Sequence, residues 1–288
     1  MMPVESSADL ERRFGGLRRL YGDIGYAHIR AAHVVVIGLG GVGSWAAEAL
    51  ARSGVAELTL IDFDHVSESN INRQVQALSS SLGQAKAQAL CERIADIHPG
   101  CVVNPVEAFA DADNWPGLLN LAASIGPTRP VAAVIDACDQ VRAKAVLAAW
   151  AMACGTPLVC VGAAGGKRHA QAVELADLAD VTHDPLLAAL RQRLRQHHNA
   201  PRKGRVNVSC VFSREAVVAP QPQPLVSNSA AESTASSDST LNCHGYGSTV
   251  SVTATFGMVA AGEVLSRLAR SSKELALPNQ ASDEKTHL

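Results

Sequence analysis

The chain has 288 residues, of which 47% are hydrophobic and 18% charged, and its formal net charge is −2. This length can bury a sizeable core, and the composition is that of an ordinary globular protein. The near-neutral charge excludes nucleic-acid binding by the whole chain, so such binding would need a local basic patch. Seven scattered cysteines without a CxxC pair argue against a disulfide framework and a four-cysteine zinc site.

The first 30 residues are expected to form a polar, amphipathic arm. Between residues 11 and 22, arginines surround Phe14, Leu17 and Leu20. The beginning of the sequence has no apolar segment typical of a secretory signal. We therefore expect a cytoplasmic protein, and peripheral association with a membrane stays open.

A nucleotide-binding unit is predicted from Val34 to Asp64. The pattern indicates a buried strand, a glycine turn, a helix beginning near Ser44 and a second strand ending at Asp62. In the GxGxxG motif, the first glycine permits a tight turn, the second lets the backbone approach a phosphate, and the third lets the helix pack on the strand. The predicted nucleotide-binding loop consists of Gly38, Gly40, Gly41, Val42 and Gly43. The Asp62 carboxylate can bind ribose hydroxyls, but enzymes that use NAD, FAD or ATP all share this unit.

Strands and helices continue to alternate after this unit. We expect a helix at 84–97, a strand at 102–106, a helix and loop at 111–130, a strand at 131–135, a helix at 142–153 and a strand at 158–161. This order predicts an α/β fold with a Rossmann-like, doubly wound, mostly parallel sheet. Ligands of such sheets lie outside the carboxyl ends of the strands, where Gly38, Asp62, Asp136 and Asp139 fall.

The remaining third of the chain is predicted to extend the same domain. It begins with a glycine-rich loop at 162–167, followed by a helix at 185–197, a strand at 206–212 and a packed helix at 250–269. A crossover loop at about 220–245 has the composition of a flexible segment. The predicted organisation is an arm at 1–30, a Rossmann-like domain at 31–170, its C-terminal part at 171–270 and a disordered tail at 271–288.

The polar residues that follow Asp62 favour ATP over a dinucleotide. A triphosphate needs cations that offset its charge and stabilise the charge that develops during transfer, and a carboxylate such as Asp139 can hold Mg²⁺. A nicotinamide-linked oxidoreductase has no evident need for these groups, although the opening motif alone allows one. The expected nucleotide contacts in this crossover are Asp64, Asn70, Arg73, Gln74 and Lys86. Asp136 is expected to contribute from the end of its strand.

The motifs GLGGVGSWAAEALARSGV, LIDFDHVSESNINRQ, GQAKA and VIDACD resemble the adenylating superfamily that includes ubiquitin-activating enzymes and bacterial activators of sulfur-carrier proteins. Within that superfamily, RFGGLRRLYG, GAAGGK, DPLLAALRQRLR and CVFSREA are most similar to the tRNA threonylcarbamoyladenosine dehydratases. The similarity covers nearly the whole chain, from about residue 13 to residue 268.

The resemblance implies a reaction and a set of site residues. The reaction is ATP-dependent dehydration of N6-threonylcarbamoyladenosine next to the tRNA anticodon, in which carboxylate activation leads to a cyclic product. The implied catalytic residues are Arg73, Lys86 and Asp139, with Asp139 beside Mg²⁺. Family members are typically homodimers in which an arginine of the partner's N-terminal segment reaches the phosphates. Arg13, Arg18 and Arg19 are the candidates in this chain.

The tRNA substrate requires a basic surface. No acidic residue occurs between Asp184 and Glu215. This interval supplies the expected phosphate contacts, although a solvated helix face explains the same pattern. The expected contacts are Arg191, Arg195, Arg202, Lys203 and Arg205. We expect tRNA, and not DNA, as the nucleic-acid partner.

An activator of a ubiquitin-like sulfur carrier is the alternative function. The zinc-binding CxxC pairs of those activators are missing from this sequence. Cys243 best matches the position of a thioester cysteine, but a small buried or mobile residue without a catalytic role is the favoured interpretation. A sulfur-relay protein partner also remains open.

Overall fold

The computed structural model describes residues 8–125, 129–217 and 246–270. Within these residues, seven strands form one sheet with the order β3-β2-β1-β4-β5-β7-β6, in which β6 alone is antiparallel to its neighbour. The strands are β1 (His33–Ile37), β2 (Glu57–Ile61), β3 (Val102–Val106), β4 (Val131–Asp136), β5 (Leu158–Val161), β6 (Val173–Asp177) and β7 (Ser209–Ser213). The predicted mostly parallel α/β fold is confirmed.

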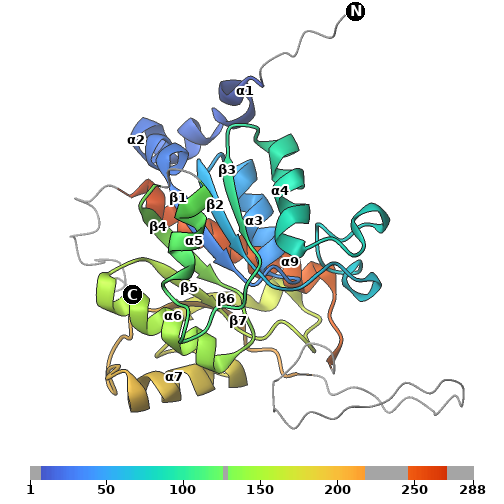
Figure 1. Ribbon diagram of the computed structural model, residues 1–288. Helices are drawn as coiled ribbons and strands as arrows, with labels where there is room; N and C mark the ends of the chain where they lie inside the picture. The colour runs from blue at the N-terminus through green and yellow to red at the C-terminus, as the bar shows by residue number, and fades with distance from the viewer. Residues whose placement is uncertain (1–7, 126–128, 218–245, 271–288) are drawn as a thin grey trace, which may run out of the picture.

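Helices cover both faces of the sheet (Figure 1). One face packs against α2 (Leu17–Ala31), α3 (Gly43–Arg52), α4 (Lys86–Ile97) and α9 (Val250–Ala269). The other face packs against α5 (Leu118–Ile125), α6 (Val141–Cys154) and α7 (Pro185–His197). Short elements complete the described structure: α1 (Leu10–Phe14), η1 (Glu68–Asn70), η2 (Ser79–Ser81) and η3 (Ala170–Ala172).

The central strand β1 shows why the chain forms this layered arrangement. Val34 and Val36 belong to the core on one face, whereas Val35 and Ile37 belong to the core on the other. All four side chains are buried, as expected for a parallel strand covered on both sides. Full burial of each such side chain contributes roughly 1.5–3 kcal/mol to folding.

Two strands differ from the sequence expectation. The edge strand β6 was not predicted, and the strand expected at 206–212 begins only at Ser209. Asn207 has a left-handed backbone with φ of 63°, which interrupts an extended strand. The N–H groups of Val206 and Asn207 instead donate to the Asp177 carboxylate, each at 2.8 Å. The predicted flexible loop and disordered tail lie outside the described residues.

Helix α9 crosses α3 closely, next to the glycine turn that follows β1. A Cβ atom at Gly257 would collide with the backbone carbonyl of Val42, so only glycine permits this approach. The crossing brings Thr253 of α9 to the ligand side of the sheet. Within the described part of the chain, no helix is long and apolar enough to cross a membrane.

The N-terminal arm is attached to the domain through His98, which follows α4. The ring of Phe14 lies edge-on to His98 with centroids 4.6 Å apart, and a guanidinium nitrogen of Arg30 lies 3.0 Å from His98 Nε2. The His98 side chain is fully buried. Burial, together with the neighbouring Arg30 charge, lowers the pKa of His98 from 6.5 to about 4.

We expect acid to destabilise the protein through His98. The unfolded chain binds a proton on this histidine below about pH 6.5, whereas the folded chain excludes it until about pH 4. The contribution to stability is complete above pH 6.5 and falls by up to about 3 kcal/mol as the pH approaches 4. Denaturant unfolding between pH 7 and pH 4 measures this loss. A His98→Gln variant has no proton to bind at this position, so its free energy of unfolding should depend less steeply on pH. The same pH dependence in both proteins would contradict the role of His98.

Candidate nucleotide-binding site

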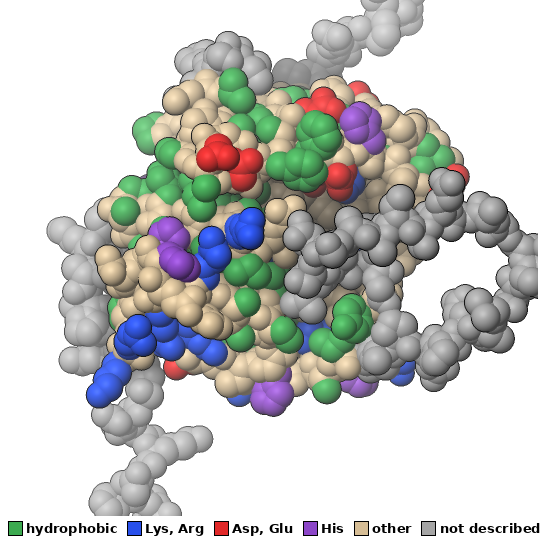
Figure 2. All heavy atoms as spheres, turned by 60° about the horizontal axis from the view of Figure 1, so that its bottom comes forward, with side chains coloured by type: hydrophobic (Ala, Val, Ile, Leu, Met, Phe, Trp, Pro, Cys, Tyr) green, Lys and Arg blue, Asp and Glu red, His purple; other side chains and the backbone are tan. Residues whose placement is uncertain are grey.

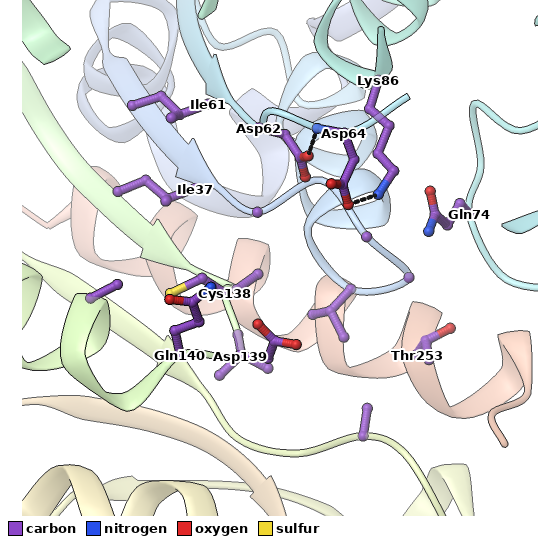
Figure 3. Close-up of a pocket in the computed structure, with 18 of the residues that line it drawn as sticks. Ile37, Ile61, Asp62, Asp64, Gln74, Lys86, Cys138, Asp139, Gln140 and Thr253 are labelled. Carbon is purple, nitrogen blue, oxygen red and sulfur yellow. Dashed lines mark hydrogen bonds and ion pairs between the residues drawn. The ribbon is translucent and has the colours of Figure 1, made fainter. Parts of the chain in front are cut away.

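A cavity of about 450 Å³ opens at the carboxyl ends of β1, β2 and β4. Since β1 lies between β2 and β4, this is the point at which the strand order reverses, the usual ligand position in a doubly wound sheet. The cavity is lined by most of the predicted residues: Gly38, Gly40, Gly41, Val42, Asp62, Asp64, Asn70, Arg73, Gln74, Lys86 and Asp139. Figure 3 shows Asp62, Asp64 and Lys86 on one side of it and Asp139 on the opposite side.

The glycine turn has the geometry of an anion-binding loop. Gly38 has φ of +84°, and a Cβ atom on Gly43 would collide with the Gly38 carbonyl. Gly40 has open space where a Cβ atom would lie. The N–H groups of Gly40, Gly41 and Val42 have no acceptor in the described part of the chain, and no side chain caps α3. Three free donors at a helix N-terminus, with room for close approach, fit a phosphate.

Asp62 is held between the glycine turn and the next loop. One carboxylate oxygen accepts the N–H of Leu39, and the other accepts the N–H of Asp64 at 2.8 Å. Burial raises the pKa of Asp62, while the nearby Lys86 charge and these two hydrogen bonds oppose the increase. Each oxygen keeps a second lone pair, so the carboxylate can still accept hydrogen bonds from ribose hydroxyls.

Lys86 presents a buried positive charge to the cavity from the first turn of α4. Its side chain is only 7% exposed, and Nζ lies 2.7 Å from the Asp64 carboxylate, which is itself mostly exposed. Because Asp64 offsets the lysine charge, the desolvated ammonium is held in a fixed position. A phosphate group entering the cavity would meet both this ammonium and the free N–H groups of the glycine turn, because both line the cavity.

The segment after η1 places Arg73 beside the glycine turn. The indole N–H of Trp45 donates to the Arg73 carbonyl at 2.9 Å, which fastens this segment to α3. The guanidinium of Arg73 donates to the Ser69 carbonyl and, at 3.0 Å, to the Asn72 side chain. These partners are neutral and exposed, so the guanidinium charge remains available to an anionic ligand.

Two predicted amides have structural partners at the cavity wall. Asn70 is buried, and its side-chain oxygen accepts the N–H of Ser67 at 3.1 Å. Gln74 is also buried and accepts a hydrogen bond from Gln76 at 3.2 Å. Gln76 in turn donates to the Leu39 carbonyl, so the amides brace the loop that follows the first glycine.

Asp136, which was expected to contact the nucleotide, does not line the cavity. Asp136 is fully buried below the cavity, and its carboxylate pairs with Lys144 Nζ at 3.1 Å. The thiol of Cys138 also lies 2.8 Å from this carboxylate. Burial lowers the pKa of Lys144, but the Asp136 charge outweighs that effect and the pKa stays above its usual value. The Asp136 carboxylate is therefore occupied by these partners and shielded from the cavity.

Asp139 is the carboxylate at this strand end that faces the cavity. Among the described residues, its side chain has no hydrogen-bond or ion-pair partner. One free carboxylate opposite a phosphate site suits Mg²⁺, which usually takes one or two protein carboxylates and completes its shell with phosphate oxygens and water. The described residues contain no cluster of three or more His, Cys, Asp or Glu side chains suited to a metal ion.

Sequence reasoning missed the apolar and small residues of the cavity wall. These are principally Phe109, Cys138, Gly162, Ala163, Ala164, Leu186 and Thr253. The GAAGGK loop was the available signal for part of this wall, because small residues leave room for a substrate. The others carry no local signal, since they reach the cavity from helices and loops that are distant in the sequence.

The predicted basic surface divides into structural and exposed arginines. Arg191 donates to the carbonyls of Leu178 and Val181, both at 2.8 Å, and Arg195 donates to the Pro201 carbonyl at 3.1 Å. Arg202 lines a second cavity together with these two residues. Lys203 and Arg205 are exposed in the following loop, and Arg205 also pairs with the buried Asp177 carboxylate at 3.8 Å. Figure 2 shows Lys and Arg side chains gathered on one part of this side of the molecule and acidic side chains on another.

The fold and this cavity define an α/β protein with a mononucleotide site at the switch point of its sheet. The ThiF family model matches residues 14–285, and the chain belongs to this family. It is similar to the tRNA threonylcarbamoyladenosine dehydratase of Escherichia coli (strain K12), with 42% identity over 93% of this chain and 97% of the relative. The enzyme of the same name from Haemophilus influenzae is 40% identical over 90% of this chain and 94% of the relative.

Solved structures point to the same family. The crystal structure of the E. coli dehydratase in complex with ATP is 40% identical in sequence to this chain, with a TM-score of 0.75. The structural match covers 92% of this chain and 97% of the crystallised chain. The resemblance predicted from the motifs is therefore confirmed at the level of the family.

Proposed function

We infer that this chain is an ATP-dependent tRNA threonylcarbamoyladenosine dehydratase. The observation that carries this inference is one cavity lined by the free N–H groups of the glycine turn, by Lys86 and by Arg73. This anion site belongs to a chain that matches the E. coli enzyme of that name over 93% of its length. The substrate is the threonine carboxylate of the modified adenosine next to the anticodon.

The residues of the cavity account for carboxylate activation. The carboxylate oxygen attacks a phosphorus atom of ATP and displaces pyrophosphate or ADP, which converts the carboxylate into a mixed anhydride with AMP or with phosphate. Asp62 binds the ribose, while the glycine turn, Lys86 and Arg73 hold the phosphates and offset the negative charge that develops on them. The carbamoyl group of the same side chain then attacks the activated carbonyl, closes the ring and releases the phosphorylated leaving group, with net loss of water.

Ring closure within one molecule needs no nucleophile from the protein. The carbamoyl group is already tethered beside the carbonyl, so much of the rate advantage comes from proximity. Cys243 lies outside the described residues, and its role as a thiol stays a prediction. A sulfur-relay partner and peripheral membrane association likewise stay predictions.

Mg²⁺ is proposed to bind at Asp139. The partner-free carboxylate across the cavity from the glycine turn supports this position. Asp139 and the phosphate oxygens would hold the ion, which would neutralise part of the phosphate charge.

Product analysis tests the proposed reaction directly. The protein is incubated with ATP, Mg²⁺ and tRNA that carries the linear modification, and the digested RNA is examined by mass spectrometry. A nucleoside lighter by one water, formed only with ATP, is expected. Unchanged nucleoside together with adenylation of a sulfur-carrier protein would favour the alternative function.

The exposed basic loop is proposed to contact tRNA phosphates. Arg202, Lys203 and Arg205 carry three exposed charges, and no acidic residue interrupts the sequence around them. Replacing all three with alanine should weaken tRNA binding and reduce the slope of log affinity against log salt by about 2. Filter binding across a salt series measures both effects. The matched control, Arg202→Lys with Arg205→Lys, preserves the charges and should retain the slope; an unchanged slope in the alanine variant would refute the contact.

A homodimer formed through the N-terminal arm is also proposed. Leu20 and Ile24 of α2 are 71% and 67% exposed, an apolar pair suited to burial in an interface. Arg13 and Arg18 have partners within the chain, whereas the Arg19 guanidinium has none among the described residues. Arg19 is therefore the proposed arginine for the partner's site. Sedimentation should show a dimer that dissociates in a Leu20→Asp, Ile24→Asp variant; a monomeric parent protein would exclude it.

A further inference from the structure

The buried ion pair between Asp136 and Lys144 lies directly below the proposed ATP site. Lys144 projects from α6 and is fully buried. Its ammonium contacts Asp136 twice, at 3.1 Å to the carboxylate and at 3.2 Å to the backbone carbonyl. The carboxylate also accepts the N–H of Cys138 at 3.2 Å and lies 3.4 Å from the Cys160 thiol. One lysine thus fixes both the side chain and the backbone at the end of β4.

The turn that follows Asp136 packs against the glycine turn. The N–H of Ala137 donates to the Ile37 carbonyl at 2.8 Å. A Cβ atom at Gly38 would lie 2.9 Å from the backbone of Ala137 and of Cys138, so the two turns are in direct contact. A displacement of the β4 end would therefore move the cavity floor.

Asp139 is the next charged residue in this turn and lacks a partner of its own. Because no described side chain holds its carboxylate, its position depends on the backbone from Asp136 to Gln140. That backbone is anchored at one end by the ion pair and at the other by the first turn of α6, which also carries Lys144. The ion pair closes this segment into a short loop with Asp139 near its centre.

We propose that Lys144 is a positioning residue that acts through Asp136 to hold Asp139 in its reactive place. The proposal rests on the proposed function of the cavity. Lys144 is fully buried and does not line the cavity, so it acts on a ligand there only through Asp136. Its effect is to hold the turn that follows β4 in a conformation in which the Asp139 carboxylate points across the cavity toward the phosphates.

The test removes both charges together. Lys144→Met alone would leave the Asp136 carboxylate buried without a cation, and that protein is expected to be unstable. The double variant Lys144→Met, Asp136→Asn keeps similar side-chain shapes without a buried charge. We expect this variant to retain its melting temperature within a few degrees, to keep the KM for ATP within about twofold and to lose at least about tenfold in kcat.

A matched control removes another ion pair with a buried carboxylate. Glu48 of α3 pairs with Arg93 of α4, away from the β4 turn. The variant Glu48→Gln, Arg93→Met should keep kcat within about twofold of the parent. A folded Lys144→Met, Asp136→Asn variant with the parent's kcat would overturn the positioning role. If that variant does not fold, Asp136→Glu replaces it, because it keeps the ion pair but lengthens it by one methylene; an unchanged kcat there would also overturn the proposal.

A binding measurement tests the positioning role of Lys144 independently of the proposed dehydration reaction. Electron paramagnetic resonance measures Mn²⁺ binding to the protein in the presence of a non-hydrolysable ATP analogue, without turnover. The Mn²⁺ affinity should fall about tenfold in the double variant and stay unchanged in the Glu48→Gln, Arg93→Met control. Failure of the parent protein to form the cyclic product would refute the proposed function, whereas equal Mn²⁺ affinity in the parent and the double variant would refute the positioning role of Lys144.

Discussion

Replacement of Arg73 by alanine is expected to lower the rate of ring closure by a factor of about 10² to 10³. The guanidinium lies beside the glycine turn, and its partners are the neutral oxygens of Ser69 and Asn72. Its charge is therefore free to stabilise the phosphate charge that develops as the carboxylate is activated. Product formation under single-turnover conditions with saturating ATP measures the loss.

The fold should survive this substitution. The Trp45 indole contacts the backbone carbonyl of Arg73, and an alanine there can still accept that hydrogen bond. Arg52→Ala is the matched control, because it removes an exposed guanidinium at the distant end of α3. Full activity in Arg73→Ala, or an equal loss in Arg52→Ala, would remove Arg73 from the set of catalytic residues.

Replacement of Asp139 by asparagine is expected to reduce product formation by a similar or larger factor. The change preserves the size of the side chain but removes the charge that is proposed to hold Mg²⁺. The partner-free carboxylate makes no contact that the fold requires. Raising the Mg²⁺ concentration should recover part of the activity, because the loss reflects weaker ion binding. Titration of the initial rate with Mg²⁺ in both proteins measures this shift.

The control for Asp139 is Asp180→Asn, which neutralises an exposed carboxylate that does not line the cavity. This variant should match the parent in rate and in Mg²⁺ requirement. If Asp139→Asn shows the parent's rate at low Mg²⁺, the metal position is wrong. If the melting temperature of Asp139→Asn falls sharply, its lower rate would reflect partial unfolding and not weaker binding of Mg²⁺.

The nucleotide-binding unit was predictable because its signals are local. Glycines at fixed spacing, a buried strand before them and an acid at the end of the next strand identify the turn around Gly38 and the position of Asp62. The alternation of elements predicted the parallel sheet for the same reason. The charge of a triphosphate pointed to Arg73, Lys86 and Asp139, all of which line the cavity, and the family resemblance added their catalytic roles.

Other features depended on contacts that the sequence does not reveal. Asp136 and Asp139 look alike in the sequence, yet one lies below the cavity floor and the other faces the cavity. The difference arises from Lys144, which reads as an ordinary helix lysine but is fully buried. Strand β6 was missed because most of its residues are only partly buried and because it pairs with a strand distant in the sequence. The alternation of apolar and polar residues along β6 is therefore weak.

Transfer of oxygen-18 from the substrate carboxylate tests whether ATP activates that carboxylate. The protein is incubated with ATP and tRNA whose threonylcarbamoyl carboxylate carries the label, and the phosphorus-containing products are analysed by mass spectrometry. One labelled oxygen per cyclised nucleoside should appear in AMP or in phosphate, because the carboxylate oxygen departs with the phosphorus group. Cyclic product with the label released only into water would contradict activation by ATP at this site.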